Sequence, residues 1–333
     1  MLKMPLSKAV REQRRKGLGG SDAGAVYGKS DYGTPLTVYW SKIAPLAPEK
    51  ESDLFWFGHE GEKFVAARIW HDLRRAKQYR GRKLIEPKAM MWHPNGWAFG
   101  NADRVLVDKK TGKWLAGYEC KWITHKAHQW SKEGENVRFP AAYYAQCFHY
   151  LWVARANGHQ LEEWWLVAAI YGRDVRYYRV PWDEDFAKKY EAKLERFWRL
   201  NVLGKIPPPP TASKRDTAIL NERFKVETDQ ALIANATTEN KLQRYRKADA
   251  EIKRLTAERD QIKNDLRNML GPSVEITGNN WRATYRAPAK PRRVVDYKAL
   301  TSELGATEKQ IARHTKPAAT SRTLRINLGE ENG

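Results

Sequence analysis

The amino-acid sequence predicts a mixed α/β domain, followed by a mainly helical C-terminal domain with a small β element. Strand and helix signals alternate upstream of residue 206. The run IPPPP at 206–210 continues neither a helix nor a strand, because proline lacks the backbone N–H donor. Downstream, apolar residues recur every three or four positions over 239–270 and stop at Gly271-Pro272. We therefore expect domains at 1–206 and 211–333, joined by a stiff linker at 207–210.

The bulk composition is that of a globular protein. Among 333 residues, 41% are hydrophobic and 30% are charged, and no apolar run approaches the roughly 18 residues of a membrane span. The N-terminal segment also has no apolar stretch of signal-peptide length. The two cysteines, Cys120 and Cys147, are too few for a disulfide framework or a four-thiolate iron–sulfur cluster. These features predict a cytoplasmic protein with free thiols.

The net charge of +21 is spread along the chain. Residues 211–333 hold 24 Lys and Arg against 16 Asp and Glu, and residues 1–210 hold 36 against 23. Because cationic side chains release counterions from phosphates when they bind, this excess favours a polyanionic partner. A basic surface kept only for solubility is the alternative.

Two segments of the first domain predict a β-hairpin. They are WAFGNADRVLVD at 97–108 and WLAGYECKW at 114–122, and the Gly-containing turn KKTGK lies between them. If the chain reverses near Thr111, Asp103 falls opposite Glu119. Residues i and i+2 of a strand project from the same face, so Lys121 is expected beside Glu119.

Two predicted helices flank this hairpin. FGHEGEKFVAARIWHDL places Glu62 at the start of an inward-facing stripe with Val65 and Ile69. FPAAYYAQCFHYLWVAR aligns Gln146 with Ala142 and other apolar residues, where a polar side chain needs a partner. Glu62 could instead be a solvated acid of the first helical turn, and Gln146 could only bridge backbone groups.

Glu62, Asp103, Glu119 and Lys121 together indicate a metal-dependent phosphodiesterase site. Carboxylates around an open position suit Mg²⁺, and a nearby lysine can position the attacking water or bind the scissile phosphate. The spacing is weak on its own, because an exposed Glu–Lys pair across two strands is the commoner arrangement.

Five sequence blocks follow one another over roughly residues 10–200: GLGGSDAGAVYGKSDYGTPLTVYWSKI (17–43), FGHEGE (57–62), GNADRVL (100–106), YECKW (118–122) and YAQCFHYLWV (144–153). In content and order these blocks resemble the YqaJ-like viral recombinase family, which belongs with the bacteriophage lambda exonuclease family in the PD-(D/E)XK nuclease superfamily. The family commonly has a proline near the first motif aspartate, whereas the residue before Asp103 in this sequence is Ala102.

The resemblance implies a restriction-endonuclease-like mixed sheet flanked by helices. It implies that Asp103 and Glu119 bind the metal with help from Glu62, that Lys121 is the motif lysine and that Gln146 is the family's late glutamine. The implied cofactor is Mg²⁺, with Mn²⁺ as a substitute.

The resemblance also implies a phosphate-binding pair, Arg14 and Ser21, which would hold the 5′-terminal phosphate of DNA. Arg11 and Arg15 lie within one turn of Arg14 and compete for this assignment. Ser21 and Asp22 could equally cap a helix N-terminus.

The implied activity is a Mg²⁺-dependent 5′–3′ exonuclease that resects linear double-stranded DNA for phage-type recombination. Residues 1–206 would form the exonuclease domain. The implied partners are DNA with 5′-phosphate ends and a single-strand annealing protein, in a ring-shaped homo-oligomer of phage or prophage origin in a bacterial host. Two alternatives stay open: an endonuclease of the same superfamily, and a non-catalytic DNA-binding protein. The long helix at 239–270 could form a coiled coil with a partner or pack on its own domain.

Overall fold

The computed structural model describes residues 8–44, 53–132, 135–226, 228–279, 281–287 and 296–314. The chain divides into two compact units, Met1–Arg223 and Phe224–Gly333. Within the described ranges, no helix combines the length and the apolar character needed to cross a lipid bilayer.

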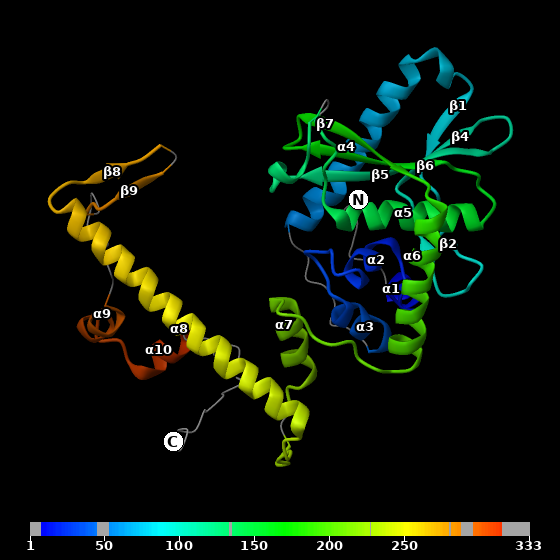
Figure 1. Ribbon diagram of the computed structural model, residues 1–333. Coiled ribbons are helices and arrows are strands. Elements are labelled where there is room, and N and C mark those ends of the chain that lie inside the picture. Colours follow the sequence, from blue (N-terminus) through cyan, green and yellow to red (C-terminus); the bar gives the residue numbers. More distant parts are fainter. Residues whose placement is uncertain are drawn as a thin grey trace. The chain divides into compact units, whose positions relative to one another are not determined.

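A five-stranded sheet forms the centre of the first unit, in the order β1-β4-β5-β6-β7 (Figure 1). Neighbouring strands are antiparallel except β5 and β6, which are parallel because α5 crosses over between them. The strands are β1 (Arg82–Ile85), β4 (Arg104–Asp108), β5 (Trp114–Ile123), β6 (Glu163–Ile170) and β7 (Asp174–Pro181).

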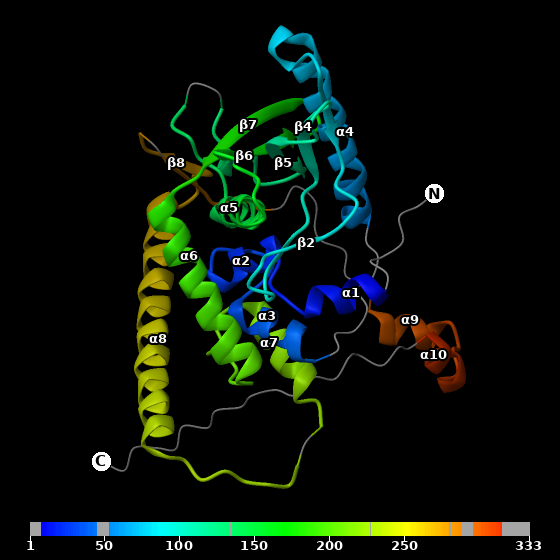
Figure 2. The same cartoon turned by 90° about the vertical axis from the view of Figure 1, so that its right-hand side faces the viewer.

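Helices cover both faces of this sheet, so the central strands β4, β5 and β6 are largely buried on both sides (Figures 1 and 2). Helix α4 (Asp53–Arg75) packs Val65 and Ile69 on the face that includes Leu106. Helix α5 (Ala141–Ala156) packs on the opposite face, where Val105 and Val107 point. This two-layer cover is the mixed α/β architecture predicted from the sequence.

The N-terminal helices form a further layer against α5. Helix α2 approaches α5 so closely that a Cβ at Gly24 would lie 3.1 Å from the Cα of Ala142. A two-stranded ribbon, β2 with β3, borders this layer. The bounds are α1 (Lys8–Arg15), α2 (Gly20–Val26), α3 (Pro35–Ile43), η1 (Lys77–Tyr79), β2 (Met91–Trp92), β3 (Phe99–Gly100), η2 (Ala127–Gln129), α6 (Glu184–Arg196) and the π-helical segment η3 (Phe197–Leu203).

The first unit extends past the proline run to α7 (Lys214–Arg223), whereas the sequence predicts a boundary at 207–210. The reason is a buried contact between α7 and the start of α3. Thr34, the N-cap of α3, donates its hydroxyl proton to Asp216 Oδ1, and Asp216 Oδ2 accepts from the backbone N–H and the hydroxyl of Thr211 at 2.6 and 2.7 Å. The chain therefore leaves the first unit at Arg223.

The second unit is mainly helical with one small ribbon, as the sequence predicts. Helix α8 (Ala236–Leu270) begins where Asn235 accepts a hydrogen bond from the Thr238 N–H and ends at Gly271, whose φ of 50° few other residues adopt. The remaining elements are β8 (Glu275–Thr277), β9 (Arg282–Thr284), α9 (Tyr297–Glu303) and α10 (Glu308–His314).

Candidate active site

Strand β5 holds an acid and a base side by side in a partly buried position. Glu119 and Lys121 point to the α5 side, while Cys120 between them points to the α4 side. Glu119 is 1% exposed, and its Oε1 accepts hydrogen bonds from Lys121 Nζ and, at 2.6 Å, from Gln146 Nε2 on α5. The predicted same-face pair is therefore an internal contact rather than a surface ion pair.

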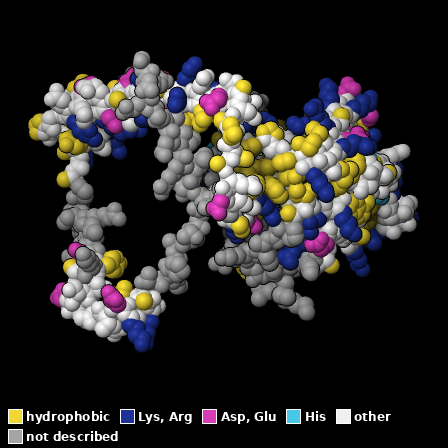
Figure 3. All heavy atoms as spheres, turned by 90° about the horizontal axis from the view of Figure 1, so that it is seen from below, with side chains coloured by type: hydrophobic (Ala, Val, Ile, Leu, Met, Phe, Trp, Pro, Cys, Tyr) yellow, Lys and Arg dark blue, Asp and Glu magenta, His cyan; other side chains and the backbone are white. Residues whose placement is uncertain are grey.

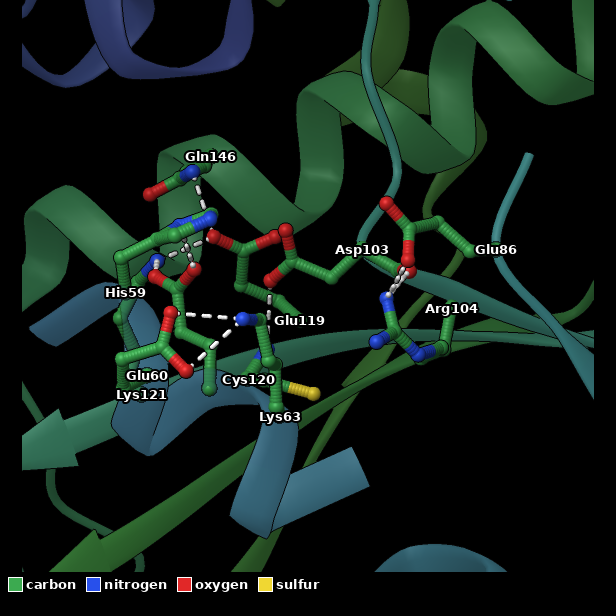
Figure 4. A network of polar contacts seen from close by, with 11 residues as sticks. His59, Glu60, Lys63, Glu86, Asp103, Arg104, Glu119, Cys120, Lys121 and Gln146 are labelled. Atoms are coloured by element: carbon green, nitrogen blue, oxygen red, sulfur yellow. Dashed lines mark hydrogen bonds and ion pairs between the residues drawn. The ribbon is translucent and has the colours of Figure 1, made fainter. Parts of the chain in front are cut away.

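Asp103 reaches the same place from the segment that precedes β4. The strand register pairs Arg104 with Tyr118, so Asp103 lies next to Glu119. This is the placement predicted from a chain reversal near Thr111. Asp103 Oδ2 accepts a 2.8 Å hydrogen bond from the backbone N–H of Cys120. In Figure 4 the carboxyl groups of Asp103 and Glu119 point toward one another.

Glu62 approaches this pair from α4. Its Oε1 lies 3.9 Å from Lys121 Nζ, and its Oε2 lies 3.6 Å from His59 Nδ1. Glu62 is partly exposed, so it stands at the solvent side of the buried Glu119. The structure thus gathers Glu62, Asp103, Glu119 and Lys121, with Gln146, into one network.

Two supporting contacts were not predicted from the sequence. Tyr150 lies one turn after Gln146 on α5, and its hydroxyl accepts a 3.0 Å hydrogen bond from Gln146 Nε2. The i, i+4 spacing of these two polar groups on one helix face was the available signal. Arg104 Nη1 donates to the Asp103 carbonyl oxygen at 2.5 Å and lies 3.1 Å from Glu86 Oε2, which steadies the backbone at Asp103 (Figure 4).

The electrostatics of the network depart from those of surface groups. Burial raises the pKa of Glu119 well above its usual value, the neighbouring Asp103 raises it further, and Lys121 lowers it in part. Burial lowers the pKa of Lys121, but Glu119, Asp103 and Glu62 outweigh this effect, so its pKa is raised. Carboxylates crowded in this way favour a bound cation.

The donor set fits a hard cation held by two carboxylates. Glu119 Oε2 is buried and has no hydrogen-bond partner among the described residues, an arrangement that is costly for a carboxylate unless something binds there. Across the described residues, no three His, Cys, Asp or Glu side chains are grouped so as to hold a metal ion. Asp103 and Glu119 are therefore the two carboxylates that could hold an ion. Two carboxylates are enough for Mg²⁺, which in proteins commonly takes one or two carboxylates and keeps several waters.

The predicted phosphate-binding residues lie in the N-terminal layer. Arg14 is at the end of α1, and its carbonyl oxygen accepts a 3.0 Å hydrogen bond from Lys42 Nζ. Arg15 is engaged by Glu12 and by the Lys42 carbonyl oxygen. Arg15 is thereby a weaker candidate for phosphate than Arg14.

Ser21 is exposed in the first turn of α2, a helix of seven residues whose N-cap is Gly19. The alternative that Ser21 caps this helix is therefore wrong. Asp22 accepts a 2.8 Å hydrogen bond from the Gly19 N–H and a 2.7 Å bond from Lys42 Nζ. Asp22, rather than Ser21, secures the turn.

Comparison with known proteins gives one family match and several similar chains. Residues 11–157 match the YqaJ-like viral recombinase domain. The uncharacterized protein YqaJ of Bacillus subtilis (strain 168) is 25% identical over 307 residues, which cover 91% of this chain and 90% of that protein.

Two solved structures are similar at the level of the chain trace. An alkaline exonuclease from Laribacter hongkongensis has 12% identity and a TM-score of 0.42, covering 66% of this chain and 99% of that chain. The same exonuclease in complex with dAMP has 13% identity and a TM-score of 0.41, covering 64% and 100%. The matched residues 11–157 include Glu62, Asp103, Glu119, Lys121 and Gln146, so the part of the chain that carries the candidate site is similar to the YqaJ-like viral recombinase domain.

Proposed function

We propose that the protein is a metal-dependent nuclease that hydrolyses phosphodiester bonds in DNA. The observation that carries this proposal is the buried Glu119, which has Asp103 and Lys121 beside it and one oxygen without a partner in the described structure. A buried acid without full hydrogen bonding destabilises a fold, so its presence favours a binding role. The family match to a viral recombinase domain supports a nucleic-acid substrate.

In this proposal Asp103 and Glu119 would hold Mg²⁺, with Mn²⁺ as a substitute, and Glu62 would assist through water. The bound ion would supply charge that polarises a phosphoryl oxygen and favours ionisation of water. The Cys120 N–H fixes the Asp103 carboxylate, and Gln146 fixes Glu119. Lys121 Nζ already donates to Glu119 and has further protons with which to orient the attacking water or a phosphate oxygen.

The finer form of the proposal is a 5′–3′ exonuclease that resects duplex ends for recombination. Arg14 and Ser21 would grip the 5′ phosphate, and a single-strand annealing protein would coat the product. A homo-oligomeric ring would keep the enzyme on one duplex. This form is supported by the family's description as a viral recombinase domain and by the exonuclease activity named for the Laribacter hongkongensis protein.

The test uses purified protein with end-labelled linear duplex DNA, with and without a 5′ phosphate, in Mg²⁺ or in a chelator. We expect mononucleotides to appear progressively from one end, only with metal, and Lys121→Ala to lower the rate at least about 100-fold. Lys126→Ala is the matched control, because Lys126 is an exposed lysine three residues after the end of β5. Its side chain forms an ion pair with Asp31 rather than with the candidate site. Loss of activity in both variants, or in neither, would contradict the assigned role of Lys121.

Two rival functions predict different results. An endonuclease of the same superfamily would nick circular plasmid and would do so unchanged after Arg14→Ala. If the protein only binds DNA, the wild type and the Lys121→Ala variant would bind DNA with equal affinity, and neither would release cleavage products.

A further inference from the structure

Helix α8 carries an apolar stripe that stays exposed in the described structure. The helix has 35 residues and so is about 52 Å long. Five of its large apolar residues are 43% to 72% exposed, namely Tyr245, Ile252, Leu255, Ile262 and Met269, and Leu266 is half-buried. Isolated helices are marginal in water and gain most of their stability from packing an apolar face. A helix of this length with an uncovered stripe therefore needs a partner surface.

The stripe follows a heptad repeat, in which positions a and d face a partner helix. Seven of its eight a and d positions are apolar, and the exception is an arginine at one a position. A 3.5-residue period is typical of a left-handed two-stranded coiled coil rather than of a helix packed on a globular surface. The a positions are Tyr245, Ile252, Arg259 and Leu266, and the d positions are Ala248, Leu255, Ile262 and Met269.

We propose that α8 of a second copy of this chain covers this stripe, and that the two helices run parallel and in register. The a and d residues at the centre, Ile252 and Leu255, are the β-branched and Leu combination that favours two parallel strands. The proposal is independent of the nuclease function, because it uses no residue of the candidate active site.

The charges that flank the stripe favour the parallel arrangement. In a parallel pair, each g residue faces the e residue five positions later on the partner helix. Arg244 then meets Asp249, and Glu258 meets Lys263, and each contact occurs twice by symmetry. The two remaining pairs join Glu251 to Thr256 and Asp265 to Leu270, and neither places like charges together.

The antiparallel alternative is poorer. With the a and d stripes fully overlapped, g residues face g residues of the other helix. Arg244 would meet Asp265, but Glu251 would meet Glu258, again twice each. Attraction and repulsion then balance, whereas the parallel pair has attraction alone.

Ion pairs within one α8 helix do not prevent these charged contacts between the two helices. Asp249 lies 3.1 Å from Lys253, and Glu258 lies 3.0 Å from Arg254. All four side chains are at least one-third exposed, and such surface pairs contribute little to stability. They can therefore be shared with or replaced by contacts to the second copy.

Arg259 is the weakest point of the proposed pair. In one chain it pairs with Asp260 at 3.1 Å on an exposed surface. In a parallel pair the two Arg259 side chains face each other at an a position, and the adjacent Glu258 of the other copy neutralises part of the charge. A single charged a residue lowers the affinity of a coiled coil while favouring one register.

The first test is disulfide cross-linking of the full chain carrying Leu255→Cys. Two d-position cysteines meet only if the helices are parallel and in register, so oxidation should convert most of this variant into a covalent dimer. Ala257→Cys, at position f on the opposite face of the same helix, is the matched control and should stay monomeric on a denaturing gel. The native Cys120 and Cys147 are fully buried and give no background. Equal cross-linking of both variants, or of neither, would overturn the proposal.

The second test is analytical ultracentrifugation of the full chain carrying Arg259→Leu. We expect the α8 pair to tighten at least ten-fold, because the charge in the seam is removed. Ala257→Leu adds the same side chain on the outer face and should leave association unchanged. If Arg259→Leu and Ala257→Leu associate alike, the stripe is not the seam between two copies. Association through the first unit would not confuse these results, because it would persist equally in both variants.

Discussion

At the scale of single residues, Glu119 is the acid on which the site depends. Its burial and its neighbour Asp103 make it costly to ionise, and Lys121 and Gln146 offset part of that cost. An acid held this way fits the proposed role of binding a cation. The surrounding residues are therefore as informative as the carboxylates themselves.

We predict that Tyr150→Phe lowers kcat by about ten-fold and leaves KM unchanged. The hydroxyl of Tyr150 holds the Gln146 amide that donates to Glu119, and residues that orient a ligand commonly have effects of this size. Steady-state nuclease kinetics measure the effect. Tyr178→Phe, which removes another buried hydroxyl that donates to the Ser131 carbonyl oxygen, should cost about 1 kcal/mol of stability without changing kcat. An equal loss of kcat in both variants would assign Tyr150 a merely structural role.

A second residue-scale prediction concerns acid stability. Burial lowers the pKa of His149 to about 4 from an ordinary 6.5, and burial lowers that of His93 to about 4 as well. His149 Nε2 donates to the Phe99 carbonyl oxygen at 2.9 Å. As the pH falls below 6.5 the unfolded chain takes up these protons first, so the native state loses stability until about pH 4, by up to about 3 kcal/mol for each imidazole.

Urea denaturation between pH 6.5 and 5 measures this loss. His149→Gln should remove about half of the pH dependence that the two imidazoles cause, although it also lowers stability at every pH. The exposed His125→Gln should change neither quantity. A slope unaltered by His149→Gln would show that other groups control acid stability.

At the scale of elements, the β4–β5 hairpin shows what a sequence can predict. Counting outward from the turn places Asp103 next to Glu119, because strand periodicity and turn position are local properties. The first strand, expected at 97–108, is broken in the structure. Phe99 and Gly100 form β3 and pair with β2, and β4 starts only at Arg104. The turn-forming residues Gly100, Asn101 and Asp103 were the local signal of that break.

The domain boundary shows the opposite case. The proline run predicts a linker by local chemistry alone, yet α7 beyond it belongs to the first unit. The bond that holds α7 joins Thr34 to Asp216, 182 positions apart in the chain. A contact over such a separation has no signature in composition or periodicity.

We predict that Gly61→Ala lowers stability by about 1 to 3 kcal/mol and reduces nuclease activity. A Cβ at Gly61 would lie 2.3 Å from Trp122 on β5, so α4 must move away from the sheet and carry Glu62 with it. Gly58→Ala is the control on the same helix, because a Cβ there meets nothing within 4 Å, and it should be neutral or slightly stabilising. Equal unfolding temperatures for the two variants would contradict the close approach of α4 to Trp122 on β5.

At the scale of the whole molecule, the net charge of +21 is the dominant feature. Lys and Arg side chains are spread over the visible face in Figure 3 rather than gathered in one tail. Surface charge of this kind acts on any polyanion and carries no sequence information. In the proposed nuclease, selectivity would therefore come from the residues around Glu119.

We predict that affinity for duplex DNA falls more than ten-fold between about 50 and 200 mM salt, because phosphate binding releases counterions. Fluorescence anisotropy in the presence of a chelator measures binding without cleavage. Thermal unfolding at the same salt concentrations is the control for the integrity of the fold. An affinity that is flat across this range would mean that the basic surface contacts few phosphates.

The buried carboxylate of Asp216 also bears on how this protein can be cut down for laboratory work. A gene truncated after the proline run at 206–210 would encode a polypeptide that lacks Asp216. The Thr34 hydroxyl would then lose its acceptor, and the N-terminus of α3 would be exposed to solvent. Such a product should precipitate or be digested by proteases in the host, while one that ends at Arg223 should purify intact.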